Sequence, residues 1–182
     1  MRDRLQAGEG LLMRPWAPAD AVAALAAMSE PSIRWQLPAP MAAVEDAERW
    51  IAARGERWES GEAHHFAVVD GAGTLLGNMA VGNVNHDHRT GFVSYWLAEA
   101  ARGRGVATRA CRALCRWSFD ELDLFRLELG HRTNNPASCK VALGAGFTVE
   151  GYERQKLEYD GVRYDVERHA RLATDPEPSV RD

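Results

Sequence analysis

Two arginines and two glycines at positions 102–105 form the stretch of this chain best suited to binding chemistry. Arg102-Gly103-Arg104-Gly105-Val106-Ala107 lies between an apolar run at 92–97, which predicts a strand, and a run from 107 to about 119, which predicts a helix. The first N–H groups of a helix lack partners, and the helix dipole is positive there, so this position favours an anion. Glycine also lets a phosphate approach the backbone closely. The motif therefore predicts a site for a phosphate-bearing ligand, with Arg104 and Arg109 as the side chains best placed to reach it.

A second polar stretch, Asn134-Asn135-Pro136-Ala137-Ser138-Cys139-Lys140, follows the strand predicted at 126–129. Asn135 is typical of a helix N-cap and Pro136 of the first helical position. The predicted helix, from 136 to about 143, begins beside the first motif on the neighbouring strand. Ser138 is therefore expected near the same cleft.

The cysteines and histidines give weaker signals. Cys111 and Cys115 are spaced like an i,i+4 metal pair, but no second pair completes a zinc set, which favours two small buried core residues. His86-Asp87-His88 is typical of a solvated turn. His64 and His65 are adjacent on a strand, where side chains alternate faces, so both are not expected to point inward. We expect no metal.

The elements that must position these residues alternate between strands and helices. The first half predicts a short strand at 11–13, helices at 18–27 and 45–58, a loop at 31–41 and an antiparallel meander at 65–69, 74–84 and 91–97. The strand at 126–129 then follows a helix, which implies a parallel pair with a right-handed crossover. Asp160-Gly161 predicts a final hairpin between strands at 147–159 and 164–172. The fold class is α+β, a mixed sheet with helices on both faces.

Length and composition bound the remaining possibilities. The chain has 182 residues, 46% of them apolar, and a net charge of −4. This predicts one domain at 11–173, with a flexible N-terminus at 1–10 and a disordered tail at 174–182. The charge gives no global field for nucleic acid, and no apolar run is long enough to span a membrane. Three cysteines and no secretory signal favour a cytoplasmic protein with reduced thiols.

A dinucleotide-binding fold is the alternative for the first motif. Positions 103–108 approach the G-x-G-x-x-G/A pattern, and Glu128 follows about 20 residues later. Three features count against it: Thr108 replaces the third glycine, five residues separate Leu97 from Gly103, and the upstream meander is wrong for a doubly wound sheet.

Together the two motifs resemble those of the GNAT superfamily of acyl-CoA-dependent N-acyltransferases. Arg102-x-x-Gly105-x-Ala107 is similar to its pyrophosphate loop, and Asn135-x-x-Ser138 with Leu143-Gly144-Ala145-Gly146-Phe147 to its second cofactor helix and the following turn. Leu12-Met13-Arg14-Pro15-Trp16, Tyr95-Trp96-Leu97 and Gly146-Phe147-Thr148-Val149-Glu150-Gly151 resemble the RimJ/RimL-like branch. The resemblance implies a mostly antiparallel sheet of six to seven strands with a parallel, splayed central pair.

The family implies acetyl-CoA as co-substrate and direct acetyl transfer to a primary amine, either a protein N-terminus or a small molecule. The residues carried over for the cofactor are Leu97, Ala98, Arg102, Gly103, Arg104, Gly105, Val106, Ala107, Thr108, Asn135 and Ser138. In this picture the pantetheine arm lies in the gap beside Leu97 and Ala98, and Ser138 donates a proton or a hydrogen bond to the leaving thiolate. The alternative function is a non-catalytic acyl-CoA-binding module on the same fold.

The general base and the acceptor site stay open at this level. Some relatives carry a glutamate where this chain has Leu157, and the adjacent Glu158 faces the other side of a strand unless a bulge intervenes. His86, His88 and a chain of waters are the other candidates for the base. Trp35 and Glu158 are the predicted acceptor-binding residues. A homodimer is possible if tryptophans are exposed.

Overall fold

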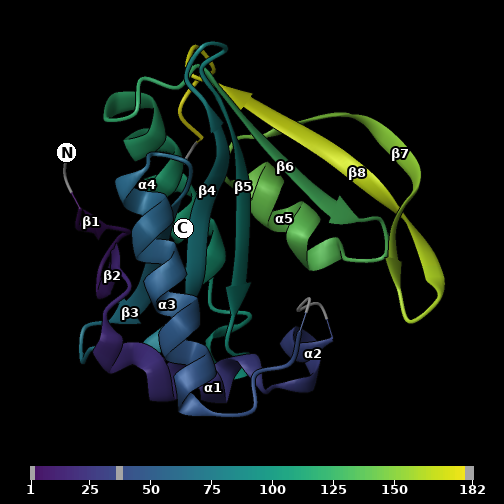
Figure 1. Ribbon diagram of the computed structural model, residues 1–182. Helices are drawn as coiled ribbons and strands as arrows, with labels where there is room; N and C mark the ends of the chain where they lie inside the picture. The colour runs from purple at the N-terminus through teal and green to yellow at the C-terminus, as the bar shows by residue number, and fades with distance from the viewer. Residues whose placement is uncertain (1–2, 36–38, 179–182) are drawn as a thin grey trace.

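The computed structural model describes residues 3–35 and 39–178, and these build one eight-stranded mixed sheet (Figure 1). The strand order is β1-β2-β3-β4-β5-β6-β8-β7. The strands are β1 (Leu5–Gln6), β2 (Leu11–Pro15), β3 (His64–Asp70), β4 (Leu75–Asn85), β5 (Thr90–Leu97), β6 (Arg126–Arg132), β7 (Thr148–Tyr159) and β8 (Val162–Leu172). The predicted α+β class, meander, crossover and final hairpin are confirmed.

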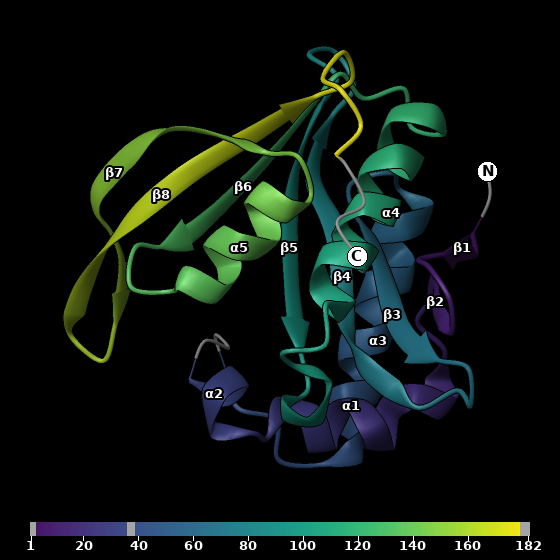
Figure 2. The same cartoon turned by 180° about the vertical axis from the view of Figure 1, so that it is seen from behind.

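The described residues form five α-helices, four of which cover the two faces of the sheet. They are α1 (Ala21–Met28), α2 (Pro31–Arg34), α3 (Val44–Glu59), α4 (Val106–Asp120) and α5 (Pro136–Gly144), with 3-10 turns at η1 (Pro18–Asp20) and η2 (Glu99–Ala101). Helices α1 and α3 pack together over one face, and α4 and α5 pack together over the other, as the two opposite views show (Figures 1 and 2). None of the helices in the described residues is both long enough and apolar enough to cross a membrane.

The central parallel pair separates after a short contact. Strands β5 and β6 pair only from Thr90–Arg126 to Phe92–Glu128, although β5 continues to Leu97 and β6 to Arg132. Every other neighbouring pair is antiparallel. The splayed pair implied by the family resemblance is therefore present, and the gap opens toward the carboxyl ends of both strands.

The ends of the described chain are more ordered than the sequence suggested. Leu5–Gln6 pair with β2, and Leu5 and Ala7 are buried, so these residues belong to the sheet rather than to a flexible N-terminus at 1–10. This added strand raises the sheet from the expected six or seven strands to eight. In the expected tail at 174–182, Glu177 is 3.1 Å from the guanidinium of Arg171, and residues 179–182 lie outside the described residues.

Two of the three cysteines lie in the core. Cys111 and Cys115 are fully buried under the sheet, as expected of small core residues. The six tryptophans are all buried or half-buried. Exposed tryptophans, which would have supported a possible homodimer, are therefore not found in this structure.

His64 and His65 both lie in the interior because helices cover both faces of β3. His64 is 2% exposed and stacks edge-on between Trp58 and Trp117, and neither of its ring nitrogens has a hydrogen-bond partner among the described residues. His65 lies on the other face, against Trp50. Burial lowers the pKa of each histidine to about 4. Both rings are therefore neutral in the fold at neutral pH.

The burial of these histidines predicts that the fold loses stability on acidification at pH values above those at which carboxylates titrate. Below a pH of about 6.5 the unfolded chain protonates His64 and the folded chain does not, so stability falls as the pH drops toward 4, by up to about 1.4 kcal/mol per pH unit for each such proton. The variant His64→Leu should make this dependence shallower and leave stability at pH 8 within about 1.5 kcal/mol of the parent. Urea unfolding between pH 4.5 and 8 measures it. The same change at exposed His88 is the control, and equal slopes for the parent and His64→Leu would contradict the account.

Candidate active site

The glycines of the 102–107 motif hold the turn into α4 open. Gly103 and Gly105 have φ angles of 72° and 70°, and a Cβ on either would meet nothing within 4 Å. Glycine is therefore required at both positions by the left-handed backbone conformation, and not because a side chain would lack room. The first hydrogen bond of the helix runs from Arg109 N to Gly105 O at 3.1 Å. The N–H groups of Val106, Ala107 and Thr108 precede it and lie at the positive end of the helix dipole.

The three arginines around this turn have different roles. Arg102 turns back and donates to the Leu97 carbonyl from Nε and Nη2, at 3.0 and 2.8 Å. The same guanidinium pairs with Glu30 at 3.2 Å, so the side chain is engaged within the protein, and cofactor binding by Arg102 stays a prediction. Arg109 donates to the carbonyl of Glu9 at 3.1 Å. Arg104 is exposed and makes one long contact, 3.5 Å to the Ala100 carbonyl, so it is the guanidinium best able to reach an anion at the turn.

The unpaired edge of β5 presents backbone groups to the gap beside β6. Ala98 N donates to Leu76 O, and Ala98 O accepts from Ala101 N, both at 2.9 Å. Because successive residues of a strand point their backbone groups to opposite sides, Leu97 N–H is directed away from β4 and into the gap. Leu97 is therefore the residue able to donate to a ligand there, and the predicted part of Ala98 is not supported, since its backbone groups are already bonded.

Gly77 brings β4 unusually close to this end of β5. It lies opposite Leu97, and a Cβ on Gly77 would stand 2.2 Å from the Trp96 carbonyl oxygen. Only glycine fits there without a shift of the backbone. The position of the β5 edge at Leu97 thus depends on a residue of the neighbouring strand.

The second motif faces the first across the gap. Asn135 caps α5 by accepting from Ser138 N at 3.2 Å, as the sequence predicted for an N-cap. The hydroxyl of Tyr95, from β5, donates to Ser138 Oγ at 2.9 Å. Burial raises the pKa of Tyr95 to about 12, so it remains a neutral donor. Tyr95 belongs to a motif that carries the family resemblance, but the sequence predicts no role for it, because a contact between positions 43 apart leaves no local signal.

Close packing between α4 and α5 fixes the two motifs relative to each other. A Cβ on Gly144 would lie 2.9 Å from the side chain of Thr108, and Arg112 donates to the Gly144 carbonyl at 2.8 Å. Thr108 was predicted to bind the cofactor; its side chain packs against α5, which leaves its N–H for that purpose.

Trp35 and Glu158, the predicted acceptor residues, do not come together. Trp35 stacks edge-on against Tyr159 at 4.7 Å, and the guanidinium of Arg132 lies 4.3 Å from the Trp35 ring. Tyr164 borders the same arginine at 5.2 Å. Glu158 is exposed, forms an ion pair of 2.6 Å with Arg163, and alternates to the face opposite Tyr159. Trp35 is therefore part of an aromatic wall around Arg132, whereas Glu158 lies outside it.

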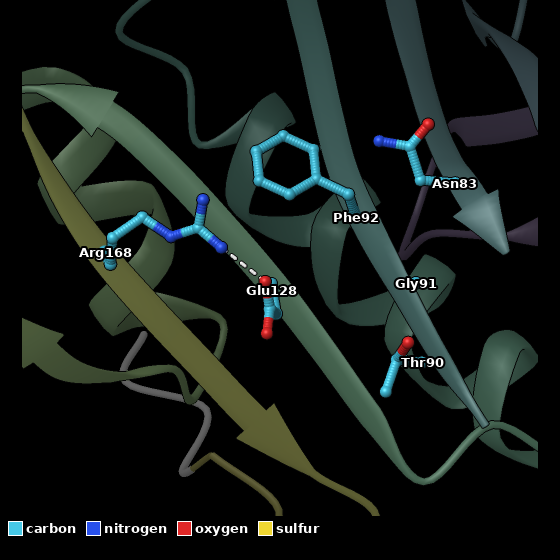
Figure 3. Close-up of a pocket in the computed structure, with 6 residues that line it drawn as sticks. All are labelled: Asn83, Thr90, Gly91, Phe92, Glu128 and Arg168. Atoms are coloured by element: carbon cyan, nitrogen blue, oxygen red, sulfur yellow. Dashed lines mark hydrogen bonds and ion pairs between the residues drawn. The ribbon is translucent and has the colours of Figure 1, made fainter. Parts of the chain in front are cut away.

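A pocket of about 300 Å³ opens where β5 and β6 still pair, on the face away from α5 (Figure 3). Its charged residues are Glu128 and Arg168, which form an ion pair, and Arg126 holds the other side of Glu128 at 2.9 Å. Both guanidinium groups are shared with further carboxylates, Arg126 with Glu150 at 2.5 Å and Arg168 with Glu153 at 3.5 Å, so Glu128 belongs to an ion-pair network. It is engaged as a structural ion pair and is neither the ribose ligand of the dinucleotide alternative nor an uncommitted base.

The two loop histidines lie at the wrong end of β5 to act as the base. His86 and His88 lie in the turn before Thr90, and the gap opens near Leu97, seven residues further along the strand. At about 3.3 Å per residue the separation is about 23 Å. These two candidates are excluded.

An anion site at a strand-to-helix turn, beside a splayed parallel pair and a capped second helix, defines the acyl-CoA-dependent N-acyltransferase class of fold. The family profile described as "Acetyltransferase (GNAT) domain" matches residues 10–148. The chain belongs to this family and is an N-acetyltransferase.

Similar proteins agree with this assignment. The chain is 32% identical over 136 residues to the probable N-acetyltransferase YjcK of Bacillus subtilis, covering 74% of this chain and 75% of that protein. It is 27% identical over 141 residues to the ribosomal-protein-serine acetyltransferase of Escherichia coli, covering 78% and 77%. It is also 27% identical over 116 residues to the spermidine N(1)-acetyltransferase of that species, covering 61% and 62%.

A solved structure shows the same fold. The chain superposes on RimL, a ribosomal L7/L12 α-N-protein acetyltransferase in complex with coenzyme A, with a TM-score of 0.86 at 21% identity, over 93% of this chain and 97% of that one. The relatives and this fold fit the RimJ/RimL-like branch that the sequence motifs resemble.

The bond between Tyr95 and Ser138 predicts that the two hydroxyls act as one unit. Tyr95→Phe removes the donor to Ser138 Oγ and should lower kcat about tenfold, the value of one hydrogen bond near a developing charge, with little change in the KM for acetyl-CoA. Steady-state kinetics on the parent, both single variants and the double variant with Ser138→Ala measure it. In the Ser138→Ala background, Tyr95→Phe should cost nothing further. Additive losses would contradict the coupling.

Proposed function

We propose that this N-acetyltransferase moves the acetyl group of acetyl-CoA to the α-amine of a protein or peptide N-terminus. The observation that carries the proposal is the order of groups along the gap between β5 and β6. The open turn at 103–108 lies at one end, Leu97 N–H and the edge of β5 follow, and the Tyr95–Ser138 pair bridges to α5.

The residues present fit acetyl-CoA. The turn offers consecutive N–H groups, an exposed guanidinium on Arg104 and an unfilled cradle over Gly103 and Gly105, which suits a pyrophosphate. An extended pantetheine arm can then run beside β5 as a strand would, using the backbone groups that β6 leaves unpaired. The thioester carbonyl would accept from Leu97 N–H, the donor directed into the gap.

The proposed reaction is direct transfer. The neutral amine attacks the thioester carbonyl carbon, a C–N bond forms and the C–S bond breaks. The Ser138 hydroxyl donates a hydrogen bond or its proton to the leaving thiolate, while the Tyr95 hydroxyl donates to Ser138 Oγ and stabilises the charge that develops there. The amine releases its extra proton to solvent, and Ser138 takes back from solvent any proton that it gave to the thiolate.

Two features favour an α-amine over a polyamine as acceptor. An α-amine, with a pKa of about 7.7–8.0, is partly neutral at pH 7, whereas an alkyl amine near 10.4 needs a stronger base. The family resemblance implies Leu157 where some relatives carry a glutamate, although the register of β7 shifts between Glu153 and Leu157. The wall beside the gap is also aromatic and cationic, with Arg132 among Trp35, Tyr159 and Tyr164. This surface disfavours a polycation and suits a peptide with acidic or apolar residues.

The donor site is tested by a change of charge at constant shape. Asp and Asn both tolerate the left-handed backbone at Gly105 and differ only in charge. Gly105→Asp should bind coenzyme A at least about tenfold more weakly than Gly105→Asn, because a carboxylate would face the pyrophosphate. Added salt should narrow the difference. Calorimetry measures both affinities, and equal binding by the two variants would overturn the assigned turn.

The acceptor is tested with a panel of amines. A peptide with a free N-terminus should exceed both its N-blocked, lysine-containing counterpart and spermidine in kcat/KM by about tenfold or more, with a rate that rises up to about pH 8.

Ser138→Ala should lower kcat on the peptide and retain coenzyme A binding. Preference for spermidine would overturn the acceptor assignment alone. Binding of coenzyme A without transfer to any amine would favour the non-catalytic module.

A further inference from the structure

Four potential metal ligands from three elements converge under α5. They are His131 of β6, Glu167 and His169 of β8, and Cys139 of α5, and their ligand atoms all lie within 4.8 Å of one another. His131 and Glu167 are directly opposite in the β6–β8 register, and His169 follows two residues later on the same face. None of these residues is assigned a role in the acetyl transfer proposed above.

The three atoms from the sheet already stand at metal-ligand spacing. His131 Nε2 is 2.9 Å from His169 Nε2, and Glu167 Oε2 is 3.2 Å from the first and 3.3 Å from the second. A point about 2.0 Å from all three lies just off the plane of this triangle, and 2.0–2.2 Å is the ordinary bond length of zinc to histidine and carboxylate. The Cys139 thiol completes a set of four.

Outer hydrogen bonds direct two of the four ligands, His131 and Glu167, toward the cluster. His131 Nδ1 lies 2.9 Å from the Arg132 carbonyl oxygen, which can only accept, so Nδ1 carries the proton and Nε2 presents its lone pair to the cluster. Glu167 Oε1 accepts from the Tyr152 hydroxyl at 2.8 Å, which leaves Oε2 for the cluster. Such outer contacts to a carbonyl and a hydroxyl are typical of zinc ligands.

Burial and charge favour a cation at this position. The His131 and His169 side chains are 4% and 0% exposed, while Glu167 at 13% and half-buried Cys139 leave a route from solvent. A carboxylate and a thiolate would together balance a divalent ion. The donor set of two imidazoles, a thiolate and a carboxylate suits zinc and is too soft for magnesium or calcium.

We propose that His131, Cys139, Glu167 and His169 form a four-coordinate Zn²⁺ site that ties the first half of α5 to β6 and β8. The site goes beyond the proposed acetyl transfer and does not depend on it. This proposal differs from the sequence-based expectation of no metal. The four ligands come from three elements that are separate in the sequence, so their spacing gives no signal, and only the packing of β6, β8 and α5 brings them together.

Cobalt titration of the full chain, freed of metal with a chelator, tests the site. One Co²⁺ per chain should bind with the visible bands of a four-coordinate ion and a near-ultraviolet thiolate band, and Zn²⁺ should displace it. Cys139→Ser, at a half-buried position, should abolish the thiolate band, and the nearly isosteric Glu167→Gln should keep it. Each variant should weaken binding about tenfold or more, since even outer contacts are worth about 10–100-fold.

The double variant His86→Ala/His88→Ala, which removes two exposed imidazoles, is the matched control and should bind as the parent does. Zinc should raise the Tm of the parent and of this control more than that of Cys139→Ser. The proposal is overturned if no saturable binding occurs, if Cys139→Ser leaves the cobalt spectrum unchanged, or if the loop variant abolishes binding.

Discussion

The separation of β5 from β6 is the constraint on which the other features of this fold depend. Beyond Phe92 and Glu128 the two strands run on without pairing, which leaves one edge of β5 in the middle of the sheet with backbone groups that need partners. An exposed edge of this kind is usually blocked or covered. Here α4 and α5 flank the gap on one face. The Arg102 side chain donates to the Leu97 carbonyl, and in the proposed function the donor substrate bonds the other backbone groups of this edge.

Arg102 is the clearest case of a residue whose role the gap determines. A generic arginine before a glycine-rich turn would be expected to meet the anion. Instead it donates twice to the Leu97 carbonyl, once to Ser32 Oγ of α2 at 2.8 Å and once to the Glu30 carboxylate at 3.2 Å. It thereby stabilises the unpaired end of β5 and attaches α2 to it. Trp35, just after α2, lies against Tyr159 and Arg132, so this short helix connects the two sides of the opening.

The sequence predicted what is local and missed what needs registration between distant segments. The anion turn, the Asn135 cap and the final hairpin are each encoded within a few residues, where glycine, asparagine and proline have specific backbone preferences. Tyr95 and Ser138 are far apart in sequence, and only the splay and the packing of α5 bring their hydroxyls together. The adjacent histidines 64 and 65 were misjudged for a related reason, since alternation cannot tell whether a second face is also covered.

The first turns of α5 show how one helix can serve two sites. Successive helical residues point about 100° apart, so Ser138 can face β5 while Cys139 faces the His131–Glu167–His169 cluster. The helix is short, and its start is fixed by the Asn135 cap and by Tyr95. A bond from Cys139 to an ion held by β6 and β8 would add a third restraint, on rotation about the helix axis. Because Ser138 precedes Cys139 directly, that restraint would also set the direction of the Ser138 hydroxyl, and the geometry of the leaving-group end of the gap would then depend on the strands that form its far wall.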